Sequence, residues 1–209
     1  MIPSIGDLLR YEASHRRPCT PLHERRLQAR FRFNPGLATG SYQFSEAELE
    51  LVRSVESEAH ERAAQFAQAA AVVPSWFPEL EGFPANGPTA VIEATMTSIA
   101  TDTNRIRSIY SAIAGNVVLR PDFAPAPRAE EVEEGWLWFR VVQVDLLAAV
   151  EFGRKRGVRC IAEPCEELEH NVMDCEYVAA AAVSGALASR DKPMQTFFRL
   201  LRTDGLLIS

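Results

Sequence analysis

The sequence predicts an α/β protein in which a helical N-terminal region precedes a parallel β-sheet flanked by helices. Apolar residues before residue 88 recur at helical spacing. After residue 88, short runs suited to strands alternate with segments of helical spacing, and strands joined through helices pair in parallel. A stretch with four prolines and two glycines, residues 74–88, lies between these halves. We therefore expect a helical region at 1–88 and an α/β domain at 89–209.

The clearest helix of the N-terminal region is predicted at residues 46–72. Ser45 takes the N-cap position and Glu48 follows three residues later, which is the spacing of a capping box. Phe44 and Leu49 stand where two apolar side chains contact each other across the first turn. The sequence therefore predicts that this helix begins directly after Ser45.

Charge is distributed unevenly along the chain. The net charge is −6, but residues 1–40 hold seven arginines against three acidic residues, so this segment carries +4 and the remainder −10. Two short helices are expected within residues 3–37. A basic arm suits a polyanion such as nucleic acid, but arginines at helical spacing more often pair with an acidic body or solvate a helix face. The expected nucleic-acid contacts are Arg16, Arg17, Arg25, Arg26 and, much later in the chain, Ser189.

Composition excludes several classes of protein. The chain is 47% hydrophobic and 24% charged, as globular proteins are, and it has no run of about 20 apolar residues that would span a membrane. The N-terminal MIPSIGDLLRYEASHRR lacks the basic start and apolar core of a secretory signal. Four cysteines among 209 residues do not form a disulfide framework. We expect a cytoplasmic protein with reduced thiols and no membrane partner.

The second half alternates between the two kinds of element. Residues 89–100 are rich in β-branched side chains and predict a strand, although a helix is also compatible with them. Two further short strands are predicted at 158–162 and 187–189. Helices are predicted at 103–115, 130–157, 164–185 and 194–202.

Two aspartates bracket the predicted turn from helix to strand. Asp174 lies in the helix 164–185, and Asp191 follows the strand 187–189. About eleven helical residues rise roughly 16 Å, and the extended chain returns over a similar distance, so the two carboxylates can meet. Adjacent carboxylates repel each other and stay ionised together only around a cation. Alternatively, Asp174 is a surface carboxylate and Asp191 is the N-cap of the helix that Pro193 opens.

The residues around these aspartates resemble the last two acidic motifs of the PIN-domain ribonucleases. In that family an aspartate precedes an alanine-rich helix, as Asp174 does, and the next strand ends in Ser or Thr, any residue and Asp, as in 189–191. The first motif of the family, a strand ending in Asp-Thr or Asp-Ser, resembles Asp102-Thr103-Asn104. The resemblance covers residues 89–209 at most and implies a PIN-like sheet.

The resemblance also implies a metal-dependent nuclease, with RNA as the expected substrate. Asp102, Asp174 and Asp191 would hold Mg²⁺ or Mn²⁺, and the metal would activate water for attack on a phosphodiester. A glutamate on an intervening helix completes the site in that family, and we predict Glu134 for this role. The other acidic residues between the motifs are Glu130, Glu131, Glu133, Asp145 and Glu151.

Two other interpretations compete with a nuclease. In the first, the PIN-like body is a non-catalytic scaffold and the N-terminal helices bind a protein partner, which the charge of −10 favours because nucleic acid must approach against it. In the second, zinc binds at four residues of suitable type spaced at intervals of five, Cys160, Cys165, His170 and Cys175. Five helical residues rotate by about 500°, so these side chains point in different directions and favour ordinary packing of the cysteines.

Overall fold

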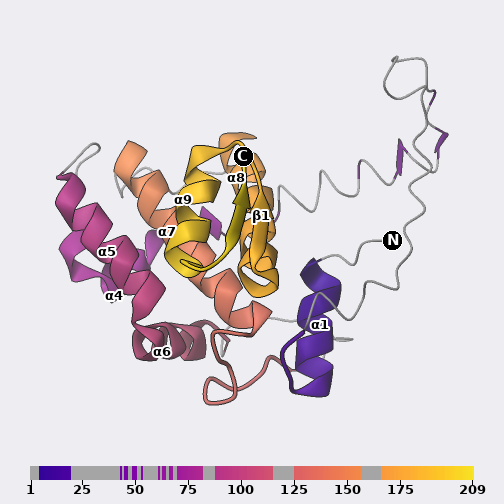
Figure 1. The fold of residues 1–209 in the computed structure, drawn as a ribbon, viewed down its shortest axis with the longest axis horizontal. Helices are drawn as coiled ribbons and strands as arrows, with labels where there is room; N and C mark the ends of the chain where they lie inside the picture. The colour runs from indigo at the N-terminus through magenta and orange to yellow at the C-terminus, as the bar shows by residue number, and fades with distance from the viewer. Residues whose placement is uncertain are drawn as a thin grey trace.

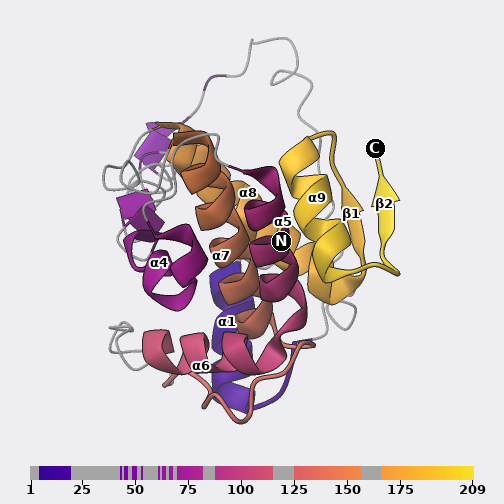
Figure 2. The ribbon, with the colours of Figure 1, turned by 90° about the vertical axis from the view of Figure 1, so that its left-hand side faces the viewer.

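The computed structural model describes residues 5–19, 88–114, 125–156 and 166–209, together with part of 43–81. Helix α7 (Leu137–Arg156) runs through the middle of the molecule. It contacts α8 (Glu166–Ser184), α5 (Thr89–Thr101) and α6 (Thr103–Ala114), and on other sides α1 (Ile5–His15) and α4 (Val73–Trp76). Figures 1 and 2 show the other helices arranged around α7.

The predicted fold class is wrong. Instead of a parallel sheet flanked by helices, the described residues contain only two strands of three residues each, β1 (Ala186–Ala188) and β2 (Leu206–Ile208). All other regular structure in those residues is helical. The PIN-like sheet that the sequence motifs implied is therefore absent from the described part of the chain.

The segment 89–100 shows why the strand prediction failed, because it forms the helix α5. The buried residues Ile92, Thr95, Met96 and Ile99 recur every three or four positions, so they share one helical face. Threonine hydroxyls in α5 donate to the carbonyl four residues earlier, as Thr95 Oγ1 does to the carbonyl oxygen of Val91 at 2.9 Å. Burial of one face at the helical period outweighed the preference of β-branched residues for strands.

The end of the chain forms a small β–α–β unit. Strand β1 pairs in parallel with β2, with Leu187 opposite Leu207, and α9 (Lys192–Leu201) connects them. A strand at 187–189 and a helix at 194–202 were predicted, but β2 was not. The predicted parallel partner, residues 158–162, lies outside the described residues. Gly205 allows the turn into β2, since a Cβ there would lie 2.4 Å from the ring of Phe198.

The N-terminal region is helical where it is described. Helix α1 is one of the two short helices predicted in 3–37, and the other falls outside the described residues. Glu46 is helical, Ser45 is not, and the carbonyl of Ser45 accepts the N–H of Leu49 at 2.9 Å, so Ser45 takes the predicted N-cap position. The described residues from 46 to 71 are all helical.

Buried side chains from both predicted regions pack into one cluster. Phe77, from before the predicted boundary at residue 88, and Ile99, from after it, are both fully buried members of this core. Gln143 of α7 joins α7 to α5, because its Nε2 donates to the carbonyl of Ile99 at 2.9 Å. Arg140, also buried, donates to Oε1 of Gln143 at 2.7 Å and holds this amide in place.

Glu12 attaches α1 to the first turn of α7. Its Oε1 accepts the N–H groups of Leu137 at 2.8 Å and Cys19 at 2.7 Å, and its Oε2 accepts the N–H of Trp138 at 3.1 Å. The first N–H groups of a helix have no partner within the helix, so this carboxylate satisfies two of them and also meets the positive end of the helix dipole. Burial raises the pKa of Glu12, and the three N–H donors oppose that shift.

Replacing Glu12 by alanine tests this attachment. The variant leaves three backbone N–H groups without their acceptor, and each unsatisfied buried donor costs about 1–3 kcal/mol, so we expect the free energy of unfolding to fall by about 3 kcal/mol or more. Urea denaturation measures this loss. Asp7→Ala is the control, because Asp7 forms an exposed ion pair with Arg10 on the same helix and should cost less than about 1 kcal/mol. Equal losses in the two variants would contradict the role given to Glu12.

Candidate functional site

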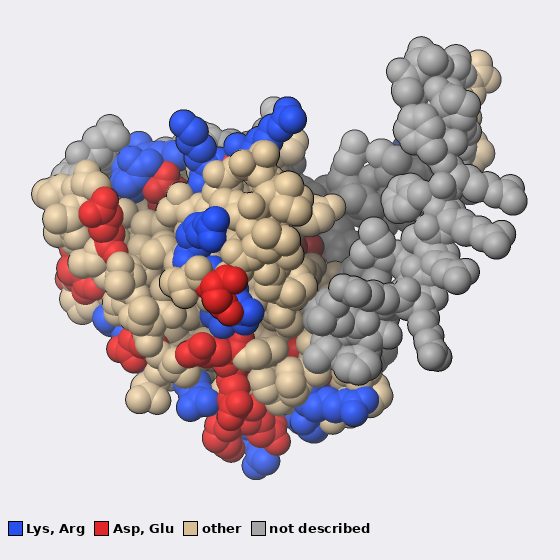
Figure 3. All heavy atoms as spheres, viewed as in Figure 1, with Lys and Arg blue, Asp and Glu red and all other residues tan. Residues whose placement is uncertain are grey.

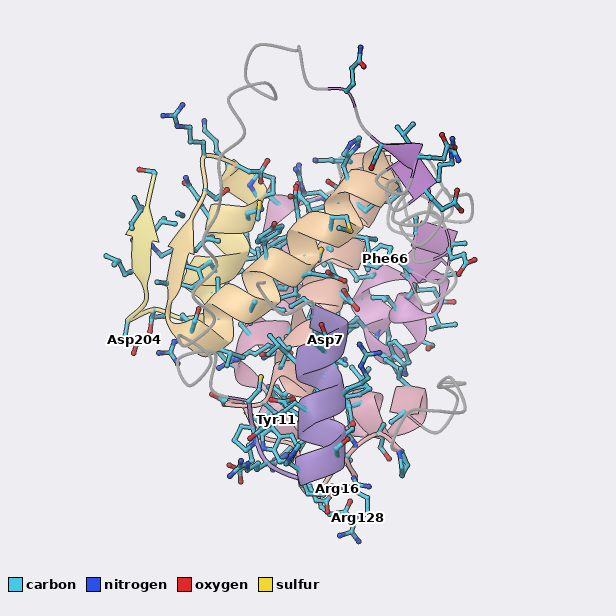
Figure 4. The ribbon with its side chains drawn as sticks, turned by 90° about the vertical axis from the view of Figure 1, so that its right-hand side faces the viewer. Asp7, Tyr11, Arg16, Phe66, Arg128 and Asp204 are labelled. Carbon is cyan, nitrogen blue, oxygen red and sulfur yellow. The ribbon has the colours of Figure 1, made fainter. Side chains whose placement is uncertain are left out.

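A surface pocket lies where α7, α8 and α9 meet. Phe66, which comes before α7 in the sequence, also lines this pocket, and Figure 4 labels its side chain. The remaining apolar lining comes from Ala148, Phe152, Val172, Cys175, Val178, Pro193, Met194 and Phe197. The polar side chains that line it are Glu151, Lys155, Asn171, Asp174 and Asp191.

The pocket brings Asp174 and Asp191 together. Helix α8 rises about 15 Å from Asp174 to its end at Ser184, and the extended chain through β1 returns over a similar distance, so α9 begins beside Asp174. Burial raises the pKa of Asp174, and the negative charge of Asp191 raises it further, while His170 acts in the opposite direction. Ionising both carboxylates therefore costs free energy in the folded protein.

Asp191 also has a structural task. It is the N-cap of α9, and its Oδ1 accepts the N–H of Met194 at 2.9 Å, as the alternative interpretation of this residue predicted. No hydrogen bond to its Oδ2 occurs within the described residues. Ser189 supports the same turn, because its hydroxyl accepts the N–H of Asp191 at 3.1 Å. One carboxylate oxygen thus caps the helix, and the other accepts no hydrogen bond from the described residues.

Asp102 and Glu134 lie away from this pocket. Asp102 separates α5 from α6, and its Oδ1 accepts the N–H of Arg105 at 3.0 Å. Glu134 accepts the hydroxyl of Thr103 at 2.8 Å and lies 3.6 Å from the guanidinium of Arg140. Arg140 precedes the first pocket residue of α7 by eight residues, or about 12 Å. Among the described residues, no three His, Cys, Asp or Glu side chains form a group that could hold a metal ion.

The other acidic candidates have local partners or do not line the pocket. Glu131 accepts from Arg128 at 2.9 Å, and this arginine holds the pKa of Glu131 below its usual range. Glu151 lines the pocket, but its carboxylate accepts Nε of Arg154 at 2.7 Å. The remaining three are Glu130, which pairs with Arg128, Glu133, which is exposed, and Asp145, which is half-buried on α7.

Of the predicted nucleic-acid contacts, Ser189 lies beside Asp191 at the pocket, whereas Arg16 and Arg17 lie near the end of α1, away from the pocket lining. Arg16 lies 3.2 Å from the carboxylate of Glu131, and Arg17 stacks over the ring of Tyr11 at 5.5 Å from its centroid. Figure 4 shows Tyr11 and Arg16 at the lower end of α1, with Arg128 nearby. Arg25 and Arg26 fall outside the described residues. The two described arginines are therefore held by the protein's own side chains.

The proposed zinc ligands do not converge where they are described. His170 is exposed on α8, whereas Cys175 is buried in the core. Burial raises the pKa of the Cys175 thiol, and the charges of Asp145 and Asp174 add to this, so the thiolate that zinc requires is disfavoured. Cys160 and Cys165 lie outside the described residues.

Lys155 and Asn171 line the pocket, although no motif of the sequence predicted them. Both residues stand at helical spacing from other residues that line the pocket. Pocket residues of α7 stand at positions 148, 151, 152 and 155, and those of α8 at 171, 174, 175 and 178. Each set follows the spacing of one helix face, but the spacing alone does not say which two faces meet.

No protein-family model, no curated protein and no solved structure matches this chain. Within the described part of the chain, no helix is long and apolar enough to cross a membrane. A function for the pocket must therefore be inferred from the residues that line it.

Replacing Asp174 by asparagine tests the repulsion between the two carboxylates. Because burial and Asp191 raise the pKa of Asp174, its ionisation costs the folded state stability, and this cost is fully present above the folded pKa and absent below the unfolded pKa. We expect the variant to be about 0.5 kcal/mol more stable than wild type at pH 7 and equal to it near about pH 3. Thermal melts at the two pH values measure this.

The control for that experiment is Asp204→Asn, which changes an exposed carboxylate beside Arg202. It should give no gain in stability at neutral pH. A loss of stability in Asp174→Asn at pH 7 would show that the carboxylate forms a favourable contact, and would contradict the repulsion.

Proposed function

We propose that the pocket binds Mg²⁺ or Mn²⁺ between Asp174 and Asp191 and hydrolyses a phosphodiester, with RNA as the first substrate to test. The observation that carries this proposal is the placement of two mutually repelling carboxylates in one pocket without an arginine among the lining residues. A divalent cation between them removes the repulsion and supplies the reactive charge. Residues 174–192 resemble nuclease motifs in sequence, but the sheet that carries these motifs in the PIN-domain family is absent from the described residues.

Two carboxylates are sufficient for such a site. Mg²⁺ keeps several of its waters and is commonly bound by one or two carboxylates plus the phosphates of its substrate. Asp102 and Glu134, which lie away from the pocket, have no part in this site. Asp191 would contribute Oδ2, since Oδ1 caps α9.

The chain's own residues around the metal have distinct tasks in this proposal. Asp174 and Asp191 would hold the cation, and a divalent cation held there would supply a water of lowered pKa and positive charge for the leaving oxygen. Lys155, the one cationic side chain among the lining residues, would contact a substrate phosphate. The amide of Asn171 can donate to a phosphate or sugar oxygen.

The distribution of surface charge supports the approach of a polyanion to this end of the molecule. Arg190 and Lys192 are exposed on either side of Asp191, where α9 begins. In the view of Figure 3, Lys and Arg side chains lie along the upper edge of the molecule and a group of Asp and Glu side chains lies at its lower edge. A chain of net negative charge thus carries two exposed cationic side chains next to Asp191.

A second candidate function is a non-catalytic interaction protein. It is favoured by the role of Asp191 as an N-cap and by the lack of a group of three metal-ligating side chains among the described residues. In this case the two carboxylates are structural, and the protein acts through its surface.

Melting temperature in the presence of Mn²⁺ separates the two candidates. A ligand that binds only the folded protein stabilises it, so about 5 mM Mn²⁺ should raise the melting temperature of wild type by about 2–4 °C if the metal binds at millimolar concentration. Asp191→Asn should lose this rise and the Mg²⁺-dependent cleavage of RNA, yet keep its fold, because asparagine caps a helix as well as aspartate does.

Glu134→Gln is the matched control. It also removes one carboxylate, but away from the pocket, and should keep both the rise and the cleavage. A wild-type melting temperature that does not respond to Mn²⁺ would refute the metal site and leave the interaction protein.

A further inference from the structure

The outer edge of β2 carries unpaired peptide groups. The N–H of Leu206 donates to the carbonyl of Gly185 at 2.9 Å, and the carbonyl of Ile208 accepts the N–H of Ser189 at 3.0 Å, so both residues direct their peptide groups toward β1. Peptide groups alternate in direction along a strand, so the N–H and carbonyl of Leu207 point away from β1. β2 ends the sheet, so that edge has no neighbouring strand among the described residues. Figures 2 and 4 show β2 as the outermost element of this side.

The same strand exposes large apolar side chains. Leu206 is 61% exposed and Ile208 is 57% exposed, whereas Leu207 between them is half-buried. On the neighbouring strand, Ala186 and Ala188 are exposed on the face opposite the buried Leu187. One face of the sheet is therefore apolar and uncovered within the described structure. An apolar open edge of this kind is a template for pairing with another strand.

We propose that β2 binds β2 of a second copy of this chain, antiparallel, around a twofold axis at Leu207. In this arrangement the two Leu207 residues exchange both of their N–H to carbonyl hydrogen bonds, since these are the groups that point outward. Leu206 of each copy then lies opposite Ile208 of the other, and the four side chains form one apolar cluster on the outer face. The two sheets of two strands become one sheet of four.

A second copy fits this edge because the edge is complementary to itself. A twofold contact uses the same surface on both partners and closes after two copies. Residues 205–209 carry no charged side chain, so no like charges meet across the axis. Asp204, which pairs with Arg202, lies at the turn before the strand and outside the paired segment. Figure 4 shows Asp204 at this turn.

The size of the contact predicts weak association. A single pair of short strands buries less than the roughly 1,200 Å² of a stable interface. We therefore expect association at a protein concentration of about 100 µM or higher, in the range of transient contacts. This inference does not depend on the metal site, because the residues that line the pocket come from Phe66, α7, α8 and α9 and include none from β1 or β2.

Sedimentation of the full chain from about 10 µM to about 1 mM tests the proposal. Wild type should move from the monomer mass toward twice that mass. Leu206→Lys and Ile208→Glu should each weaken association by about fivefold or more, since each removes apolar pairs from the outer face. An equimolar mixture of these two variants should associate more strongly than either alone, because the lysine introduced in one variant then faces the glutamate introduced in the other.

Two further variants control for folding and position. Thr196→Lys places the same charge on an exposed position of α9 and should leave association unchanged. Leu207→Pro removes the outward N–H without touching the bonds to β1, and should abolish association while circular dichroism shows the helices intact.

Three results would overturn the proposal. Wild type that stays monomeric at the highest concentration would exclude the contact. Dimers that form equally well with Leu206→Lys would place the interface elsewhere. Slow hydrogen exchange at the amide of Leu207 in dilute monomer would mean that another segment of the same chain already covers this edge.

Discussion

The carboxylate of Glu12 is the constraint on which the arrangement of the helices depends. It is fully buried and accepts three backbone N–H groups, two from the start of α7 and one from Cys19. A buried carboxylate is stable only with such donors, and the first turn of a helix offers them together with the favourable end of its dipole. Glu12 thereby fixes where α7 begins relative to α1. Trp138 adds a second link, since its indole N–H donates to the carbonyl of Leu9 at 3.0 Å.

The position of α7 then determines where the pocket forms. Gln143 in its first half holds the end of α5, and Ala148 to Lys155 in its second half line the pocket with α8 and α9. The two carboxylates come from α8, which carries Asp174, and from the N-cap of α9, which is Asp191. Strand β1 connects these two helices and brings the start of α9 back to Asp174. The cap at Asp191 links stability to function in our proposal, because the residue that starts α9 also presents its second oxygen to the pocket.

The sequence predicted the helices and the meeting of two aspartates better than it predicted the fold class. Capping residues and apolar spacing are local, and they correctly indicated the start after Ser45 and the helices α6, α8 and α9. The return of the chain from Asp174 to Asp191 also follows from the lengths of the local elements.

The prediction of a strand at 89–100 was wrong because burial of one helical face in the core outweighed the intrinsic preference of these residues for strands. Asp102 and Glu134 could not be placed from spacing, since their distance from the pocket depends on how α5 and α7 cross. Glu12 gave no signal as an isolated acidic residue in a short helix.

The central claim is that a divalent cation binds between Asp174 and Asp191, and NMR with Mn²⁺ tests it directly. Paramagnetic Mn²⁺ broadens the signals of nuclei close to it, so it reports the location of the metal without any assumption about the substrate. Our account predicts that low concentrations of Mn²⁺ broaden the amide signals of Asp174, Met194 and their neighbours first, while those around Asp102 and Glu134 stay sharp. Broadening that begins around Asp102, or equal broadening at every exposed carboxylate, would contradict it.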